Sequence, residues 1–148
     1  METKGGFYIT QIKQLQDRIF GRMLLDKGIE LSGTQGRILF VLWKDDNLSI
    51  SQISERTSLA KNTVSIIVSG MVRKGIVERK MSPENRRQTI ISLTGHAKSL
   101  RRKYETVSDK MGTLFYQGFT KREQKEFEHY LFRILTTLTN EMSAKEYS

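Results

Sequence analysis

The stretch from Leu48 to Leu93 decides the fold, and it reads LSISQISERTSLAKNTVSIIVSGMVRKGIVERKMSPENRRQTIISL. Its pattern predicts a helix, a turn, a second helix, a strand, a basic loop and a second strand. The second helix is expected over residues 61–74, where five apolar residues recur at helical spacing: Val64, Ile67, Val68, Met71 and Val72. Such a stripe indicates a helix with one buried face.

The opposite face of this helix is small, mostly polar and free of acidic residues. Its candidate contact residues are Lys61, Asn62, Thr63, Ser65, Ile66, Ser69 and Arg73. A helix with an apolar back and such a front can enter the major groove of duplex DNA. Asn62 has two possible roles, a bidentate contact to adenine or a helix-start cap together with Thr63. Thr63 and Ser65 are expected to reach phosphates, and Ile66 either contacts a thymine methyl group or is simply exposed.

A loop over residues 82–88, SPENRRQ, joins two strands expected over residues 76–81 and 89–93. Pro83 and Asn85 favour a turn, which places Arg86 and Arg87 at the tip of a hairpin. Two adjacent arginines suit insertion into a narrow minor groove. The alternative is an ordinary solvent-exposed hairpin. The whole pattern predicts a mainly α fold with a small β-hairpin wing, a winged helix-turn-helix.

The positive charge coincides with this motif. Residues 61–103 hold eleven Lys and Arg against two Glu, a net +9, which equals the net charge of the whole 148-residue chain. The rest of the protein therefore nets zero. A basic patch of this kind neutralises phosphates and releases counterions, so double-stranded DNA is the expected partner. A basic surface that serves only solubility is the alternative.

Composition argues against several other classes of protein. Cysteine is absent, which excludes disulfides and thiolate metal sites. His96 and His129 are isolated, and a structural metal needs about four ligands. No glycine-rich phosphate loop, nucleophile elbow or acid–base pair suggests an enzyme, and no cofactor is expected. Neither a membrane span nor a signal-peptide core is visible, so we expect a cytoplasmic location.

Three further helices are expected over residues 6–27, 95–117 and 121–142, each with an apolar stripe that the motif does not cover. A symmetric homodimer would bury these stripes and present two recognition helices about 34 Å apart to a pseudo-palindromic operator. We therefore assign residues 1–31 and 95–148 to a helical dimerisation region and residues 32–94 to the DNA-binding domain. Gly21 lies inside the first helix, where glycine costs about 1 kcal/mol relative to alanine. Either a close helix approach requires it or the helix tolerates it.

Several short segments, in this order and spacing, resemble one known family. They are Leu31–Ser32 with Gln35, Asn62–Ser65, Arg73–Arg79, Pro83–Arg87 and Ile91–Gly95. Together they resemble the MarR family of bacterial transcription regulators over nearly the whole chain. The resemblance implies a homodimeric winged-helix protein, usually a repressor, often released from DNA by a small aromatic or phenolic effector. The family commonly has aspartate where Asn85 stands and often arginine where Ile66 stands.

A further helix is expected from the cap at Ser32 to about Trp43, and it is the second helix of the chain. The resemblance also implies an effector pocket near the first two helices and the start of the fifth. Aromatic residues gather in those two helices, namely Phe7, Tyr8, Phe20, Phe40 and Trp43. Ordinary aromatic core is the alternative for each of them, and no effector-binding residue is assigned. A winged-helix module that binds proteins without specific DNA binding is the alternative function. Acidic residues in place of Arg86 and Arg87 would have favoured that alternative.

Overall fold

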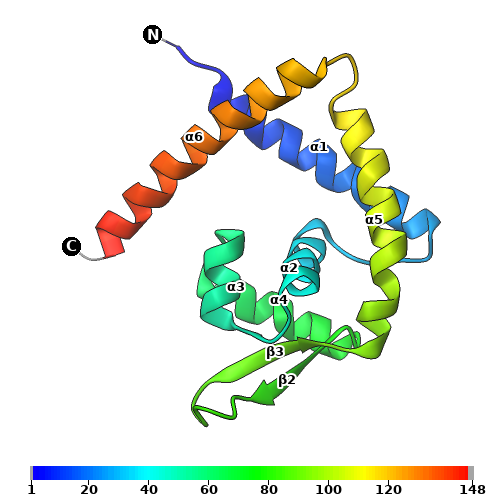
Figure 1. Cartoon of the computed structure of the whole chain (residues 1–148), viewed down its shortest axis with the longest axis vertical. Helices are drawn as coiled ribbons and strands as arrows, with labels where there is room; N and C mark the ends of the chain where they lie inside the picture. Colours follow the sequence, from blue (N-terminus) through cyan, green and yellow to red (C-terminus); the bar gives the residue numbers. More distant parts are fainter. Residues whose placement is uncertain (1, 147–148) are drawn as a thin grey trace. The chain divides into compact units, whose positions relative to one another are not determined.

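The computed structural model describes residues 2–146, which form six helices and three strands (Figure 1). In chain order these are α1 (Gly5–Asp26), α2 (Gly33–Lys44), β1 (Leu48–Ser49), α3 (Ile50–Thr57), α4 (Lys61–Arg73), β2 (Val77–Met81), β3 (Thr89–Leu93), α5 (Gly95–Phe115) and α6 (Lys121–Glu146). The described chain divides into two compact units, residues 2–111 and residues 112–146. The predicted mainly α fold with a hairpin wing is confirmed.

The three strands form one antiparallel sheet in the order β1–β3–β2. The predicted hairpin is confirmed, with Val77 opposite Leu93 and Met81 opposite Thr89. Strand β1 was not predicted, because its two residues are too few to show an alternating pattern. Just before β1, Asp46 Oδ1 accepts a hydrogen bond of 3.0 Å from the backbone N–H of Leu93. That bond helps to hold the end of β3 against the start of β1.

Capping boxes, in which a serine or threonine pairs with a glutamine or glutamate three residues ahead, begin three of the helices. Ser32 with Gln35 opens α2, and Ser49 with Gln52 opens α3. In each box the serine hydroxyl accepts from the glutamine backbone N–H at 3.1 Å. The third box joins Thr120 and Glu123 at the start of α6, through bonds of 2.9 and 3.1 Å. These caps satisfy backbone donors that would otherwise lack partners.

Helix α2 lies at the centre of the first unit. Its residues Ile38, Leu39 and Leu42 are fully buried, as are Ile53 of α3 and the α4 residues Val64, Val68 and Met71. The predicted apolar stripe of α4 is therefore confirmed as its buried face, with Ile67 and Val72 half-buried at its margin. This packing supports α4 from behind and leaves its other face open.

Polar contacts attach α1 and the first half of α5 to α2. Asp17 of α1 accepts a hydrogen bond of 3.0 Å from Arg37 Nη2 of α2. The indole N–H of Trp43 donates to the carbonyl of Ala97 at 3.1 Å, and Arg101 donates to the carbonyl of Trp43 at 3.1 Å. Two parts of the chain more than fifty residues apart are thereby joined at the end of α2.

The second unit contains the end of α5, the turn at Gly118 and helix α6. Aromatic rings fill the turn, where Tyr116 lies with its ring centroid 5.7 Å from Phe119 and 6.2 Å from Phe127. The Tyr116 hydroxyl donates to Glu128 Oε2 at 2.6 Å. Beyond this turn α6 leaves large apolar side chains exposed, namely Tyr130, Phe132, Ile134, Leu135, Leu138 and Met142.

No helix of the described residues is both long enough and apolar enough to span a membrane. The assignment of residues 1–31 and 95–148 to dimerisation and of residues 32–94 to DNA binding stays a prediction. The boundary between the two compact units falls elsewhere, within α5 at residues 111–112.

Candidate nucleic-acid interface

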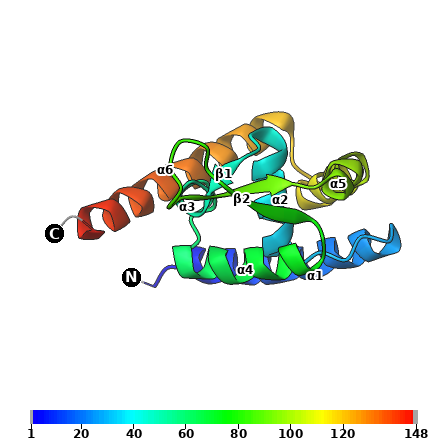
Figure 2. The ribbon, with the colours of Figure 1, turned by 90° about the horizontal axis from the view of Figure 1, so that it is seen from below.

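Helix α4 exposes most of the residues that were predicted from the sequence to contact DNA. Lys61, Asn62, Thr63, Ser65, Ile66 and Arg73 are all exposed. Ile66 is the clearest case, because 72% of this large apolar side chain is open to solvent. Figure 2 shows the helix side-on, and β2 of the hairpin packs against it. The fold therefore brings a rigid helix to the surface with a mixed polar and apolar front.

Asn62 does not cap the helix. The N-cap of α4 is Ala60, which has no side-chain hydrogen bond, and the first helical bond runs from Val64 N–H to the Ala60 carbonyl at 3.0 Å. The capping alternative for Asn62 and Thr63 is therefore wrong, because both residues lie inside the first turn. The Asn62 amide stays exposed at the start of the helix.

Ser69 differs from the other predicted contact residues because its hydroxyl is already engaged. The Ser69 hydroxyl donates to the Ser65 carbonyl at 3.0 Å and accepts from Arg79 Nη2 at 2.6 Å. Arg79 belongs to β2, so this bond joins the hairpin to the exposed side of α4. The sequence did not predict a role for Arg79 in the interface. Ten residues separate it from Ser69, and no local pattern could have predicted the pair.

The wing loop, residues 82–88, is ordered by its own hydrogen bonds. The backbone N–H of Ser82 donates to the Gln88 carbonyl at 2.9 Å and closes the loop. The buried Ser82 hydroxyl accepts from the N–H groups of Glu84 and Asn85 at 3.3 and 3.4 Å. Asn85 Oδ1 in turn accepts from the backbone N–H of Arg87 at 3.1 Å. These bonds fix the backbone from which both arginines project.

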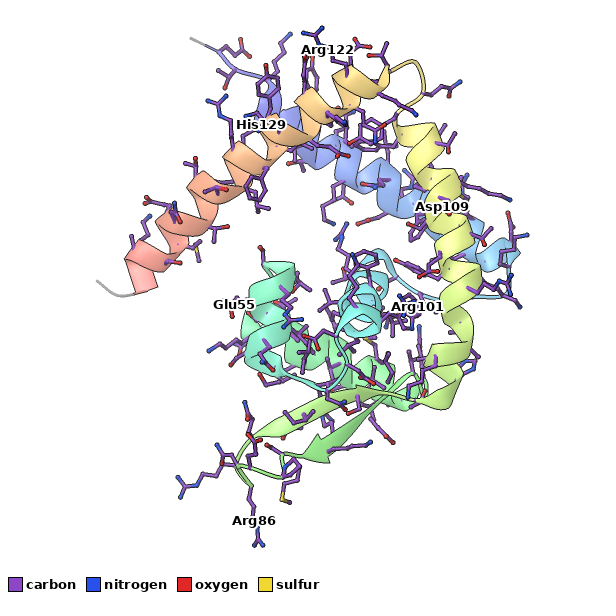
Figure 3. All side chains as sticks on the ribbon, viewed as in Figure 1. Glu55, Arg86, Arg101, Asp109, Arg122 and His129 are labelled. Atoms are coloured by element: carbon purple, nitrogen blue, oxygen red, sulfur yellow. The ribbon has the colours of Figure 1, made fainter. Side chains whose placement is uncertain are left out.

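Arg86 and Arg87 are exposed in the turn of this loop. Figure 3 shows Arg86 reaching away from the sheet at the far end of the hairpin. Within the described chain neither guanidinium has an ion pair, whereas Glu78 on β2 is paired with Lys80 at 3.2 Å. Two unneutralised cations thus stand on an ordered tip, where an anionic partner can reach them.

The five aromatic residues of the first two helices do not form one cluster. Phe7, Tyr8 and Phe40 are exposed, whereas Trp43 is buried and Phe20 half-buried. Phe20 and Trp43 each pack against Tyr104 of α5, with ring centroids 5.3 and 4.9 Å from the tyrosine ring, whereas Phe7 and Tyr8 contact each other at 6.4 Å. Burial raises the pKa of Tyr104 to about 12. This tight packing favours the interpretation of these rings as core.

Comparison with known proteins identifies the family to which the chain belongs. The MarR family model matches residues 31–89. The organic hydroperoxide resistance transcriptional regulator of Bacillus subtilis is 30% identical over 118 residues, which cover 78% of this chain and 76% of the relative. The chain belongs to the MarR family. It is accordingly a DNA-binding transcriptional regulator with a winged helix, and the resemblance seen in the sequence is confirmed.

Solved structures of MarR proteins share the fold. A mutant MarR from E. coli complexed with operator DNA aligns with a TM-score of 0.80 at 19% identity, covering 88% of this chain and 92% of that one. The PcaV transcriptional regulator from Streptomyces coelicolor, in complex with its natural ligand, aligns with a TM-score of 0.80 at 20% identity. That alignment covers 90% of this chain and 93% of PcaV. The MarR relatives named here are regulators and not enzymes.

No group of three or more His, Asp or Glu side chains in the described part of this MarR-family chain could hold a metal ion. His96 is exposed on the first turn of α5, and the His129 ring lies 6.0 Å from the ring of Tyr130. The two histidines belong to different helices and take no part in the interface described above.

Proposed function

We propose that this MarR-family chain is a homodimeric repressor that binds a pseudo-palindromic operator in double-stranded DNA. In this proposal α4 reads the major groove and the wing loop contacts the minor groove. A small aromatic effector releases the complex. The observation that carries the proposal is the exposed front of α4 beside an ordered wing, whose two arginines have no ion pair within residues 2–146. We further propose that the protein acts in the cytoplasm, where bacterial DNA lies.

The major-groove role rests on the residues exposed along α4. Lys61, Thr63, Ser65 and Arg73 supply groups that suit phosphate contacts at the rim of a groove. Asn62 and Ile66 suit base edges, since an amide can pair with adenine and an aliphatic group can contact a thymine methyl. Ser69 has a different part in the proposal. Through its bond to Arg79 it holds the hairpin against α4, which sets the spacing of the two reading elements.

The wing role rests on the charge of Arg86 and Arg87 and on the order of their loop. A preformed tip loses little conformational freedom when it binds, which favours association. Arginine is also the residue that narrow minor grooves attract most strongly. A solvent-exposed hairpin without a partner would not account for the net positive charge of residues 61–103.

The dimer is supported by exposed apolar surface on helices that lie outside residues 32–94. In α1 the exposed large apolar side chains are Phe7, Tyr8, Ile9, Ile12, Leu15 and Leu25, and α6 exposes the residues named above. Exposed apolar area on this scale marks an interaction surface in a protein that stays in solution. We propose that residues 1–31 and 95–148 pair with a second copy of the chain and leave residues 32–94 to bind DNA.

The alternative function is a winged-helix module that binds other proteins without specific DNA binding. The unpaired arginines on the wing and the net charge of +9 over residues 61–103 favour DNA instead. Duplex DNA and a protein partner also respond differently to salt, because only DNA releases a condensed counterion atmosphere.

The two reading elements can be tested with one variant in each. Arg87→Ala removes a charge that contacts phosphate or the minor groove, so we expect weaker binding to every duplex and a salt slope lower by about one unit. Asn62→Ala removes no charge, so the slope should stay unchanged. The loss should be roughly 1–3 kcal/mol on the operator alone, with relaxed preference at one symmetric pair of positions. Binding titrations at several salt concentrations on operator and scrambled DNA measure both.

Arg122→Ala is the matched control, because it removes one exposed cation from α6, where Arg122 pairs with Glu126 at 3.2 Å. This variant should bind like the wild type. If Arg87→Ala behaves like the control, the wing does not touch DNA. If Asn62→Ala weakens operator and scrambled DNA equally, the base-reading role of Asn62 fails. A wild-type protein whose DNA binding is insensitive to salt would favour the protein-binding alternative.

A further inference from the structure

The side chain of Arg79 lies against the exposed front of α4, although Arg79 itself belongs to β2. Its Nη2 donates a hydrogen bond of 2.6 Å to the Ser69 hydroxyl. That hydroxyl in turn donates to the Ser65 carbonyl at 3.0 Å, so its proton is committed to α4 and its oxygen is left to accept from Arg79. Ser65 is exposed, together with Asn62 and Ile66 of the same front. The guanidinium is therefore fixed at the margin of the surface that is proposed to read DNA.

The alternation of side chains along β2 explains why Arg79 is directed at α4. Arg79 shares a face of the hairpin with Val77, which is buried, and its cross-strand partner Ile91 is fully buried. Glu78 and Lys80 lie on the other face, where they pair with each other at 3.2 Å. Arg79 is thus on the core-facing side of the hairpin, at the point where this side becomes exposed and β2 contacts α4.

The positive charge of Arg79 is not neutralised by the protein. Arg79 is exposed, and within residues 2–146 it forms no ion pair. Its hydrogen-bond partner there is a neutral hydroxyl, and this bond engages only one of the several N–H donors of a guanidinium. A contact that served only to hold the hairpin against α4 would need one donor and no charge. The charge and the other donors are therefore left for a partner outside the described chain.

The position of Arg79 decides which part of a duplex it meets. In the proposed complex α4 enters a major groove and the wing loop, residues 82–88, contacts the neighbouring minor groove. A sugar–phosphate backbone runs between these two grooves. A cation held between the two reading elements faces that backbone, and a guanidinium suits phosphate oxygens because it can donate two parallel hydrogen bonds.

We propose that Arg79 binds a backbone phosphate between the two grooves, and that Ser69 is the residue that positions it. The Ser69 hydroxyl holds one side of the guanidinium and leaves the other side to the phosphate. The contact fixes the register of α4 and the wing on the duplex and adds affinity on any sequence. This inference rests on the proposed function, because it requires that α4 and the wing bind DNA.

A mixed-sequence duplex of about 30 base pairs, three helical turns, tests the contact without an operator. Arg79→Gln keeps a donor for Ser69 and loses the charge. We expect at least about threefold weaker binding and a salt slope lower by about one unit for each copy of the chain on the duplex. Arg79→Lys keeps the charge, so its slope should stay near that of the wild type. Unchanged affinity and slope in folded Arg79→Gln overturn the proposal.

Lys80→Gln is the matched control, because Lys80 is the next residue of β2, lies on the opposite face and is paired with Glu78. It should bind like the wild type. Circular dichroism confirms that each variant is folded, and Arg79→Met is the second neutral variant should Arg79→Gln misfold. If Lys80→Gln lowers the slope as much as Arg79→Gln does, the effect belongs to the overall charge of the hairpin, and the proposed contact is wrong.

Variants of Ser69 test the positioning role. Ser69→Ala removes the acceptor but keeps the charge of Arg79, so we expect weaker binding with a nearly unchanged salt slope. In the Arg79→Gln background the same change should have no further effect, because the guanidinium that Ser69 positions is gone. Ser69→Asp should pair with Arg79 and lower the slope as Arg79→Gln does. Equal losses from Ser69→Ala in both backgrounds would show that Ser69 does not act through Arg79.

Methylphosphonate substitution, which replaces one charged phosphate oxygen by a methyl group, locates the contact. It is placed at each backbone position in turn of an operator that the wild type selects from random duplexes. One symmetric pair of positions, between the major-groove and minor-groove contacts, should weaken the wild type at least about threefold and leave Arg79→Gln unaffected. If every position affects both proteins equally, Arg79 does not bind a phosphate, while the proposed function stands. If the wild type binds no duplex at all, the proposed function fails and this contact fails with it.

Discussion

Single residues decide how closely the elements of the first unit approach. Gly36 of α2 is buried, and a Cβ atom there would lie 2.7 Å from the Tyr104 hydroxyl oxygen and 3.2 Å from its Cε2. Tyr104 cannot easily move away, because its ring packs against Phe20 and Trp43. The missing side chain at residue 36 is therefore what lets α5 lie against α2.

Gly36→Ala should consequently destabilise the fold. Overpacking of this kind costs roughly 1–3 kcal/mol, which outweighs the gain in helix propensity of about 1 kcal/mol. Chemical denaturation followed by circular dichroism measures the free energy of unfolding. Gly112→Ala is the control, because a Cβ there meets nothing within 4 Å and residue 112 lies inside α5. The control should be neutral or stabilising. A Gly36→Ala variant as stable as the control would contradict the close approach seen here.

At the scale of elements, helix α3 depends on its cap more than the longer helices do. It has eight residues, which is too few for a helix to be stable alone. The capping box of Ser49 and Gln52 fixes its start, and the Ser54 hydroxyl donates to the Leu59 carbonyl at 2.5 Å after its end. Because α3 leads directly into α4, its stability also fixes the position of α4.

Ser49→Ala removes the acceptor for the Gln52 backbone N–H and should cost about 1 kcal/mol of stability. Ser51→Ala is the matched control, because Ser51 is an exposed serine inside the same helix with no side-chain hydrogen bond among the described residues. It should be neutral or slightly stabilising, since alanine is the better helix former. Thermal and denaturant unfolding compare the pair. Equal stability of the two variants would show that the Ser49 cap contributes nothing.

At the scale of the whole molecule, the exposed apolar stripe of α6 is the feature that one copy of the chain leaves unexplained. Leu135 and Leu138 are 50% and 60% exposed, and α6 has no buried residue among those described. A second copy that covers this stripe would remove apolar area from water. It would also supply the second copy of α4 that the proposed pseudo-palindromic operator requires.

Leu135→Glu/Leu138→Glu should therefore abolish the dimer or prevent folding, because paired charges in an apolar interface lose their hydration. Thr136→Glu is the control on the opposite side of α6 and should remain dimeric. Sedimentation velocity reports the oligomeric state, and circular dichroism reports helicity. A double variant that sediments as an intact dimer with native helicity would refute this architecture.

The sequence by itself determined the helices, the hairpin and the exposed front of α4, with bounds close to those of the structure. These features depend on local rules. An apolar stripe repeats every three or four residues, a serine caps a backbone donor three residues ahead, and a glycine ends a helix with a positive φ, as Gly75 does here at 71°. The charge count also showed that the excess of positive charge belongs to residues 61–103.

Only the tertiary structure decided which side chains meet across the chain. It formed the hydrogen bond between Ser69 and Arg79 and paired the short strand β1 with β3. It left Phe7, Tyr8 and Phe40 exposed, whereas the Trp43 ring is buried. It also brought Lys74 within hydrogen-bond distance of Glu30 and Gln35. It also showed that no other helix of the described chain approaches Gly21 closely, because a Cβ atom there would meet nothing within 4 Å. These outcomes depend on contacts between residues 10 to 44 positions apart, as for Ser69–Arg79 and Glu30–Lys74. Periodicity and capping rules act within a few residues and carry no information at that range.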